Sequence, residues 1–414
     1  NNPEDINMNG TFEPRHKDSV RNGASGDLNG IDDDNNGYVD DVIGYDLIDQ
    51  KLANFGDYLD PDPVPADEGE HGTSVAGVAA AVADNEIGIA GVAPNAKILT
   101  ARAFDATGNG EASDISAAII YAALNGADII NMSFGEDYYS PLMHDAIKFA
   151  DAMGCVLVAS SGNNNWYFEH YPSDLPEVIS VGGSDETDRK FGKSNYGSRL
   201  DLIAPGLSIQ TTMTGKDYGK ASGTSLSAPF VSGVAALLLE NDPDLSPAEI
   251  KGILKNTAQD VEPAGWDVKT AAGILDADKA LKEPVKSRLK FISPQDRHVI
   301  DFAKTDKIPL EVDILNPLFN KYEIMTGKGY LPSKFDSTDI TGNVQVKNKV
   351  IGTLTADDFT ETVSVNGEQV SKVIDTLYTI SLKIDIKKKK TVEERIRIKV
   401  FSEASPFTFI NAGT

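Results

Sequence analysis

The most constraining feature of this sequence is the alternation of strand-like and helix-like segments between residues 71 and 282. Short apolar runs such as 155–159 are separated by longer stretches rich in Ala, Ile and Leu, such as 112–125 and 225–239. Residues 246–249, Ser-Pro-Ala-Glu, match a capping box and predict the start of a further helix. This alternation predicts an α/β fold in three layers, with a mainly parallel sheet covered on both faces. Functional residues in such folds gather at the carboxyl ends of the strands.

The last third of the chain has a different pattern. Residues 310–314, 378–386 and 395–400 are rich in Val and Ile, and Gly, Asn and Asp turns separate them. This pattern predicts an all-β, sandwich-like accessory domain. Residues 1–282 carry a net charge of −27 and residues 283–414 one of +2, and Glu283-Pro284 interrupts a helical pattern. We therefore expect two domains, 1–282 and 283–414.

The overall charge and composition exclude several classes of function. A formal net charge of −25 opposes binding to nucleic acid and to anionic membranes. No apolar run reaches the roughly 18 residues that a membrane span needs. The single cysteine, Cys155, excludes an intramolecular disulfide framework, and its place in an apolar run predicts a packed thiol. Solubility, bound cations and basic partners remain as roles for the acidic excess.

Three short segments carry residues of chemical interest. In residues 221–229, Ala-Ser-Gly-Thr-Ser-Leu-Ser-Ala-Pro, Ser225 stands at the start of a predicted helix, where unpaired N–H groups stabilise negative charge. His71 opens another helix in His-Gly-Thr-Ser-Val-Ala-Gly, and Asn163 follows a buried strand in Ser-Ser-Gly-Asn. Taken singly, Ser225 is better explained as a helix cap and His71 as a structural or solvated side chain, and Asn163 has the alternative of a turn residue.

In their order along the chain, His71, then Asn163, then Ser225, the three motifs resemble those of the subtilisin-like serine protease family, the subtilases. The resemblance covers about residues 30–282 and implies a serine endopeptidase that cleaves protein or peptide substrates through an acyl-enzyme. It implies Ser225 as the nucleophile and His71 as the general base. The Asn163 side chain and the Ser225 backbone N–H would form the oxyanion hole. Ser74 departs from many members, which have a second His there, and this leaves the chemistry intact.

The resemblance also implies a substrate groove. Residues 133–135 and residues 108–110 match edge strands that pair with the substrate backbone. Residues 160–162, together with residues 133–135, would border the pocket for the P1 side chain. The residues of the three segments are, in turn, Ser133, Phe134 and Gly135; Gly108, Asn109 and Gly110; and Ser160, Ser161 and Gly162. Tyr171-Pro172 matches a step that is cis in many relatives, which predicts a cis bond here. The P1 preference and the role of the C-terminal domain stay open.

The third member of a subtilase triad is missing from the expected place. The family carries an Asp first in the chain, at the end of an apolar strand and before Thr-Gly or Ser-Gly. Asp46 ends the most similar run, 42–46, but neither dipeptide follows it. An Asp between His71 and Ser225, the chymotrypsin-like order, belongs to β-barrels, which the predicted helices oppose.

Because the sequence opens at Asn1 without an initiator Met, we expect the Asp on an upstream segment or on a separate N-terminal fragment or propeptide. The alternative is a pseudoenzyme or binding scaffold with a subtilase fold that lacks the acid.

Two segments predict structural Ca²⁺. Residues 32–37 match the first half of a calcium loop, Asp-x-Asp-x-Asn-Gly, although Ile43 stands where such loops close with Glu. The predicted ligands there are Asp32, Asp34, Asn36, the carbonyl of Tyr38, Asp40 and, to close the shell, Asp41. A solvated acidic turn is the alternative. Residues 84–89 resemble a calcium loop of the family, with Asn85 and the carbonyls of Ile87 and Ile89 as ligands. We therefore expect a calcium-stabilised enzyme that is secreted or held at the cell surface.

Overall fold

The structure, a computed structural model, describes residues 36–41, 43–49, 61–67, 69–261, 265–282 and 284. Between 288 and 401 it describes all residues except 303, 306, 317–318, 330–331, 333, 366–367, 374–375 and 387–389. Two predicted calcium ligands, Asp32 and Asp34, lie outside the described residues.

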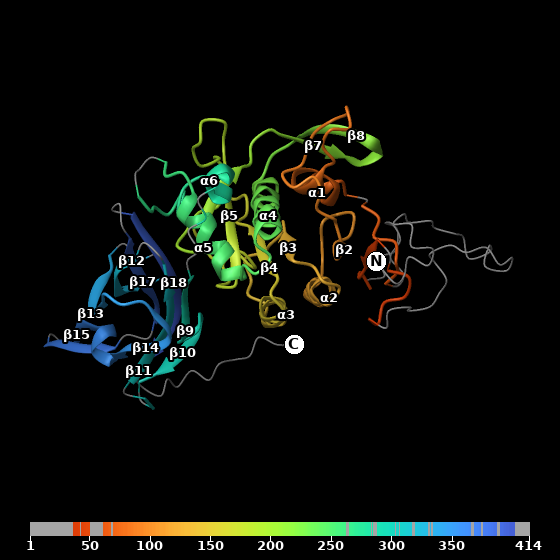
Figure 1. Cartoon of the computed structure of the whole chain (residues 1–414). Helices are drawn as coiled ribbons and strands as arrows, with labels where there is room; N and C mark the ends of the chain where they lie inside the picture. Colours follow the sequence, from red (N-terminus) through yellow and green to blue (C-terminus); the bar gives the residue numbers. More distant parts are fainter. Residues whose placement is uncertain are drawn as a thin grey trace.

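A parallel sheet of four strands, in the order β3-β4-β5-β6, lies at the centre of the N-terminal region (Figure 1). Its strands are β3 (Ile129–Met132), β4 (Val156–Ser160), β5 (Val178–Ser184) and β6 (Leu202–Pro205). Every residue of β4 is buried, and successive side chains enter opposite apolar clusters: Val156 and Val158 one, Leu157 and Ala159 the other. The predicted parallel sheet with two covered faces is confirmed.

Helices cover both faces of this sheet. Helices α2 (Ala112–Leu124) and α3 (Pro141–Ala152) pack into the cluster that contains Leu157. Helices α4 (Thr224–Asn241), α5 (Pro247–Thr257) and α6 (Ala277–Lys282) pack into the cluster that contains Val158. The predicted capping box at the start of α5 is present, since the Glu249 and Ser246 N–H groups each donate to the other residue's side chain. In the described part of the chain, no helix is long and apolar enough to cross a bilayer.

Two short strands stand apart from the central sheet. Strands β1 (Gly44–Asp46) and β2 (Thr100–Arg102) pair with each other in parallel. Helix α1 (His71–Ala80) packs against the hairpin of β7 (Ile209–Met213) and β8 (Asp217–Ala221), which a 3-10 turn (Thr214–Lys216) connects. The close approach requires Gly77, because a Cβ there would lie 2.1 Å from the Thr212 hydroxyl.

The edges of β2 and β3 face one hollow. Among the described residues, β2 pairs only with β1, and β3 only with β4, so each strand keeps one edge open. Both strands line a hollow of about 2470 Å³, together with residues of α1, α2 and α4. His71 and Ser133 also line it. Much of its wall is apolar, including Ile119, Ile130 and Met132.

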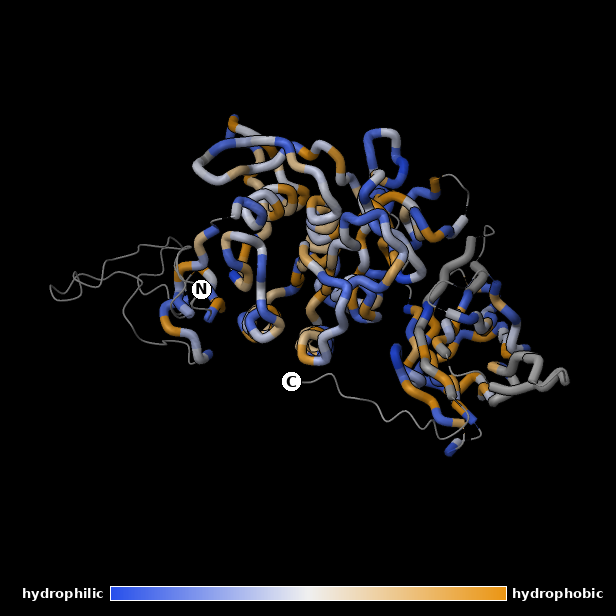
Figure 2. Tube along the Cα trace, turned by 180° about the vertical axis from the view of Figure 1, so that it is seen from behind, coloured by the Kyte–Doolittle hydropathy of each residue, from blue (hydrophilic) through white to orange (hydrophobic). Residues whose placement is uncertain are grey.

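The C-terminal region, residues 288–401, consists of strands and one 3-10 helix (Ala356–Phe359) where the structure describes it. A five-stranded sheet has the order β10-β18-β17-β12-β13, a three-stranded sheet the order β14-β11-β9, and β15 pairs with β16. The first two sheets bury side chains in one apolar cluster. Apolar and polar residues alternate along the strands (Figure 2). The strands are β9 (Arg288–Ser293), β10 (His298–Asp301), β11 (Lys307–Leu315), β12 (Phe319–Lys328), β13 (Asp336–Gly342), β14 (Val346–Thr355), β15 (Thr360–Val365), β16 (Glu368–Val373), β17 (Thr376–Ile386) and β18 (Lys390–Phe401).

Candidate active site

Ser225 is the second residue of α4, as the sequence predicts to within one position. Backbone N–H groups in the first turn of a helix have no intrahelical acceptor, so the Ser225 N–H can face a bound anion. The Ser225 Oγ donates a hydrogen bond to the Ser133 carbonyl at 3.1 Å, and the Ser133 Oγ donates to the Ser225 carbonyl at 2.8 Å. This reciprocal pair joins the start of α4 to the segment that follows β3.

Asn163 lies beside the same helix terminus. Its Oδ1 accepts hydrogen bonds from the Thr224 N–H at 2.9 Å and from the Thr224 hydroxyl at 3.2 Å. A Cβ on Gly223 would lie 3.5 Å from both Nδ2 and Oδ1 of Asn163. Oδ1 is the acceptor for Thr224, and Nδ2 is the donor atom of the same amide. The structure therefore brings Asn163 and the N-terminus of Ser225's helix together, as the sequence motifs predict.

His71 is the first residue of α1. Asp67 fixes this terminus, because its Oδ2 accepts from both the backbone N–H and the hydroxyl of Thr73, each at 2.6 Å. The side chain of His71 is exposed to solvent on one side, but nearby protein atoms partly desolvate the imidazole and lower its pKa, and the Asp67 charge opposes this shift. A lowered pKa keeps the ring neutral near pH 7, which is the form that a general base needs.

Among the described residues, His71 forms no hydrogen bond with Ser225 or with a carboxylate. Asp46, the most similar match to a family Asp, is buried and forms an ion pair with Arg102 on the neighbouring strand. It also accepts the Ile48 N–H at 3.1 Å. Burial raises the pKa of Asp46, while the Arg102 charge opposes this shift. Asp46 is therefore engaged with Arg102, away from any contact with His71.

The three segments expected to border the substrate groove follow β2, β3 and β4. Gly108, Asn109 and Gly110 lie in an exposed loop after β2, which the Asp105 carboxylate closes by accepting the N–H groups of Thr107 and Asn109. Residues 133–135 follow β3, and residues 160–162 form the end of β4 and the turn after it. Their common position at the carboxyl ends of strands is where α/β folds place their sites.

The sequence did not identify His170 as part of this groove. A Cβ on Gly135 would lie 2.2 Å from the His170 ring, and one on Gly162 would lie 2.9 Å from it. The ring therefore packs against two of the predicted groove segments. It is buried, its Nδ1 pairs with the Ser173 hydroxyl at 2.9 Å, and desolvation lowers its pKa to about 4. The only available signal was that it precedes Tyr171-Pro172, whose peptide bond is cis, as predicted.

The described half of the first calcium loop is tightly folded. Asn36 accepts the Tyr38 N–H at 2.7 Å and donates from Nδ2 to Asp41 at 3.0 Å. Asp40 and Asp41 are buried, and Gly37 has the positive φ that the motif predicts (93°). Carboxylate, amide and carbonyl oxygens are the donors that Ca²⁺ prefers, so the residue types present here are compatible with the ion.

The second predicted calcium loop is more exposed. Asn85 accepts the Ile87 N–H at 3.2 Å, and the Ile87 side chain is 65% exposed. Ile89 is half-buried. Gly88 packs on Tyr218, whose ring would lie 2.0 Å from a Cβ at that position.

A group of acids that the sequence did not single out gathers elsewhere. Side-chain oxygens of Asp49, Glu111 and Asp114 lie within 4.8 Å of one another. Burial raises the pKa of Asp114, and the charges of Asp49 and Glu111 act in the same direction.

Comparisons with known proteins agree on one family. The sequence model described as "Subtilase family" matches residues 23–273. The chain is 43% identical over 218 residues to the "Thermophilic serine proteinase" of Bacillus sp. (strain AK1), covering 53% of this chain and 54% of that protein. It is 37% identical over 234 residues to "Thermitase" of Thermoactinomyces vulgaris, covering 56% of this chain and 82% of that protein.

Among solved structures, a protease chain from Pseudoalteromonas arctica PAMC 21717 is similar with a TM-score of 0.53 and 34% identity. The match covers 57% of this chain and 82% of that one. The alignments with the first relatives reach only 54% and 61% of those proteins. Because the family match spans more than half of the chain and includes the segments of His71, Asn163 and Ser225, this protein belongs to the subtilase family.

Proposed function

We propose that this protein is a serine endopeptidase that hydrolyses peptide bonds through an acyl-enzyme on Ser225. The observation that carries the proposal is the pairing of Asn163 with the first turn of α4. Because Thr224 donates to the Asn163 oxygen, Nδ2 remains as the donor atom of this amide, and we assign it together with the Ser225 N–H to the oxyanion hole. Two such donors stabilise the oxyanion of a tetrahedral intermediate.

In the proposed reaction, the Ser225 Oγ attacks the scissile carbonyl carbon while His71 takes the hydroxyl proton. His71 then gives this proton to the leaving amine as the C–N bond breaks, and water hydrolyses the acyl ester by the same steps. Protein and peptide substrates would pair with residues 133–135 and 108–110 as an added strand.

The third triad member, we propose, is an Asp on a strand that fills the hollow between β2 and β3. The open edges of the two strands support this, because one parallel strand between them would satisfy both and close a single continuous sheet. Its carboxyl end would lie at the edge where β3 leads into Ser133. His71 lines the same hollow, so an acid there would meet the imidazole.

Such a strand would belong to an upstream segment or to a separate N-terminal fragment or propeptide. Intact mass spectrometry of the active, purified protein checks this. We expect either a polypeptide longer than these 414 residues or a second, co-purifying one. A stable and active species of 414 residues alone would rule the proposal out.

The alternative function, a binding scaffold without catalysis, has one observation in its favour: the Ser225 hydroxyl points to Ser133 and not to His71. A fluorophosphonate probe separates the two functions, because only an activated serine reacts rapidly. We expect the probe on Ser225 in the wild-type protein and none in S225A. A folded protein that carries the additional strand and still does not react would establish the scaffold.

Further proposals concern the surroundings of the site. We propose Ca²⁺ at residues 36–41 with Asp32 and Asp34, and a second ion at Asn85 with the carbonyls of Ile87 and Ile89. We also propose a domain boundary at 282/283 and a β-sandwich beyond it, supported by the apolar cluster that two sheets share. Secretion or display at the cell surface agrees with a lone, buried cysteine and calcium-based stability.

A further inference from the structure

Arg297 of the C-terminal region lies against two tyrosines of the N-terminal region. Its guanidinium carbon is 4.2 Å from the ring centroid of Tyr139 and 5.2 Å from that of Tyr171. Its Nη1 forms an ion pair with Glu169 at 3.1 Å and also contacts the Tyr171 hydroxyl, which donates to Glu169 at 2.7 Å. Stacking and ion pairing together fix a planar guanidinium in one orientation. We refer to Arg297, Tyr139, Tyr171 and Glu169 as the arginine clamp.

Tyr171 of the clamp forms a backbone bridge with Glu136, and Tyr139 lies close to it. The Tyr171 N–H donates to the Glu136 carbonyl at 2.7 Å, and the Glu136 N–H donates to the Tyr171 carbonyl at 2.9 Å. Tyr139 follows Glu136 by three residues, and its ring meets the Tyr171 ring edge-on with centroids 5.5 Å apart. Arg297 therefore contacts both chain segments that the bridge connects.

The bridge directly adjoins the proposed substrate groove. Gly135 precedes Glu136, and a Cβ on Gly135 would lie 2.6 Å from the Tyr171 carbonyl oxygen. His170, which precedes Tyr171, packs on both Gly135 and Gly162. Because packed backbones of this kind do not move independently, a displaced Tyr171 would displace the groove segments on both sides.

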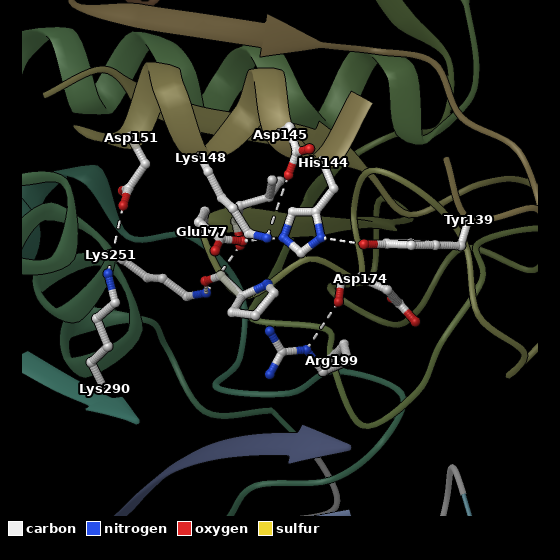
Figure 3. A network of polar contacts seen from close by, with 12 residues as sticks. Tyr139, His144, Asp145, Lys148, Asp151, Asp174, Glu177, Arg199, Lys251 and Lys290 are labelled. Atoms are coloured by element: carbon white, nitrogen blue, oxygen red, sulfur yellow. Dashed lines mark hydrogen bonds and ion pairs between the residues drawn. The ribbon is translucent and has the colours of Figure 1, made fainter. Parts of the chain in front are cut away.

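A second anchor holds Tyr139 on its other side. The Tyr139 hydroxyl pairs with Nδ1 of His144 on α3 at 2.8 Å, and Nε2 of His144 pairs with Glu177 at 3.2 Å (Figure 3). The tyrosine ring is thus fixed at its hydroxyl by the N-terminal region and across its face by Arg297.

We infer that Arg297 is a positioning residue for peptide cleavage, through which the C-terminal region holds residues 133–135 in place for substrate. Arg297 contacts none of Ser225, His71 and Asn163. Its loss should therefore weaken substrate binding more than the chemical step. This kinetic consequence rests on the proposed peptidase function, whereas the structural coupling does not.

The experiment compares R297A with K290A in the full-length protein. Lys290 of β9 also joins the two regions, through a 3.5 Å ion pair with Asp151 of α3, but this pair does not include a groove residue (Figure 3). Both variants thus remove a cationic side chain that joins the same two regions. Thermal unfolding of both variants reports any general loss of stability.

Hydrogen exchange gives the first readout, in an S225A background that prevents self-digestion. We expect R297A to speed exchange of the Glu136 and Tyr171 amides by about three- to tenfold, the range for loss of a partly buried cation–π contact. K290A should leave both rates within about twofold of the parent. Unchanged rates in R297A, or equal acceleration in K290A, would overturn the inference. An inactive wild-type enzyme would count against the proposed function alone, because exchange does not need activity.

Peptide kinetics give the second readout. R297A should raise KM by about three- to tenfold and change kcat by less than about twofold, while K290A changes neither. R297K, which keeps the charge but not the planar stack, should fall between R297A and the wild type. An R297A effect confined to kcat would contradict a positioning role. If R297A does not fold, E169Q and R297K test the same contacts, and unchanged exchange and KM in both would overturn the inference.

Discussion

The Ser225 hydroxyl donates to the Ser133 carbonyl at 3.1 Å, while the Ser133 hydroxyl donates to the Ser225 carbonyl at 2.8 Å. The nucleophile of the proposed mechanism is therefore held against a segment of the proposed substrate groove. Ser133 also accepts from Asn131 at 2.9 Å, and Asn131 accepts from Ser232 of α4 at 2.9 Å. A chain of hydroxyl and amide groups thus sets the start of α4 relative to the end of β3.

This arrangement predicts that S133A lowers kcat/KM. The substitution removes the donor to the Ser225 carbonyl, and a lost hydrogen bond of this kind reduces transition-state stabilisation by about three- to tenfold in rate. The matched control is S232A. It removes a hydroxyl that also links α4 to β3, through Asn131, but lies further along the helix than Ser225. We expect similar small decreases in melting temperature from both and a kinetic loss only from S133A. Equal kinetic losses would show that the chain supports the fold and not the site.

The two atoms of the Asn163 amide have separable roles. Oδ1 is an acceptor for Thr224, whereas Nδ2 is the proposed oxyanion donor. N163D keeps the acceptor and N163A removes both. We expect kcat to fall by about 10²- to 10³-fold in both variants, the magnitude known for one such donor in a subtilisin, while only N163A loses about 1 kcal/mol of unfolding free energy. Urea unfolding and single-turnover kinetics check this, and an N163D enzyme with normal kcat would exclude Nδ2 from the oxyanion hole.

The sequence predicted the fold best at the boundaries of helices and strands. The motifs of Ser225 and His71 lie where α4 and α1 begin, and that of Asn163 lies where β4 ends, because local capping and turn chemistry fix such boundaries. The catalytic roles assigned to these residues stay predictions. The complete burial of β4 and the alternating burial along β11 were likewise evident from the local apolar pattern.

Contacts between distant segments could not be predicted in this way. Asp46 resembled the end of a catalytic strand, but its partner Arg102 lies 56 residues away on the strand beside it. The packing of His170 on Gly135 and Gly162 depends on how three loops approach one another in space. Local sequence carries no record of such approaches, so it predicts neither the Asp46 ion pair nor the packing of His170 against the groove segments.

The pH dependence of the proposed general base follows from Asp67. Desolvation lowers the pKa of His71 and the Asp67 charge raises it, so D67N should lower the pKa of His71 further. The acid limb of the kcat/KM profile, where His71 protonates and activity falls, should then move to lower pH. Asn retains an acceptor for the Thr73 N–H, so the helix terminus stays capped.

The control for this prediction is E70Q, which removes a neighbouring charge that bonds to Thr214. At low ionic strength, where screening is weak, the acid limb of the kcat/KM profile should move further in D67N than in E70Q. A shift of the D67N limb to higher pH would contradict the stated origin of the His71 pKa.

Calcium removal should destabilise the protein. An ion that binds only the folded state adds RT ln(1 + [Ca²⁺]/Kd), or about 2.7 kcal/mol at a hundredfold excess over Kd. Excess EDTA should therefore lower the melting temperature, and added Ca²⁺ should restore it. D40N should weaken this response, because Asn tolerates the positive φ of Asp40 (60°) but lacks its charge. N85A tests the second loop separately, and a melting temperature insensitive to EDTA in the wild type would exclude both sites.

His170 should make the protein sensitive to acid. Its pKa is about 4 in the folded state, against about 6.5 when unfolded, so between these values only the unfolded chain binds the proton. Its contribution to the free energy of unfolding is intact above about pH 6.5 and is lost as pH falls toward 4, by about 3 kcal/mol in total.

The variant H170N tests this, because Asn retains a polar partner for Ser173. Although less stable at pH 8, it should lose less stability on acidification than the wild type. H298N, at an exposed histidine, is the control and should follow the wild type. Unfolding free energies measured from pH 8 to 4 decide the point, and parallel curves for H170N and the wild type would assign the acid sensitivity to other groups.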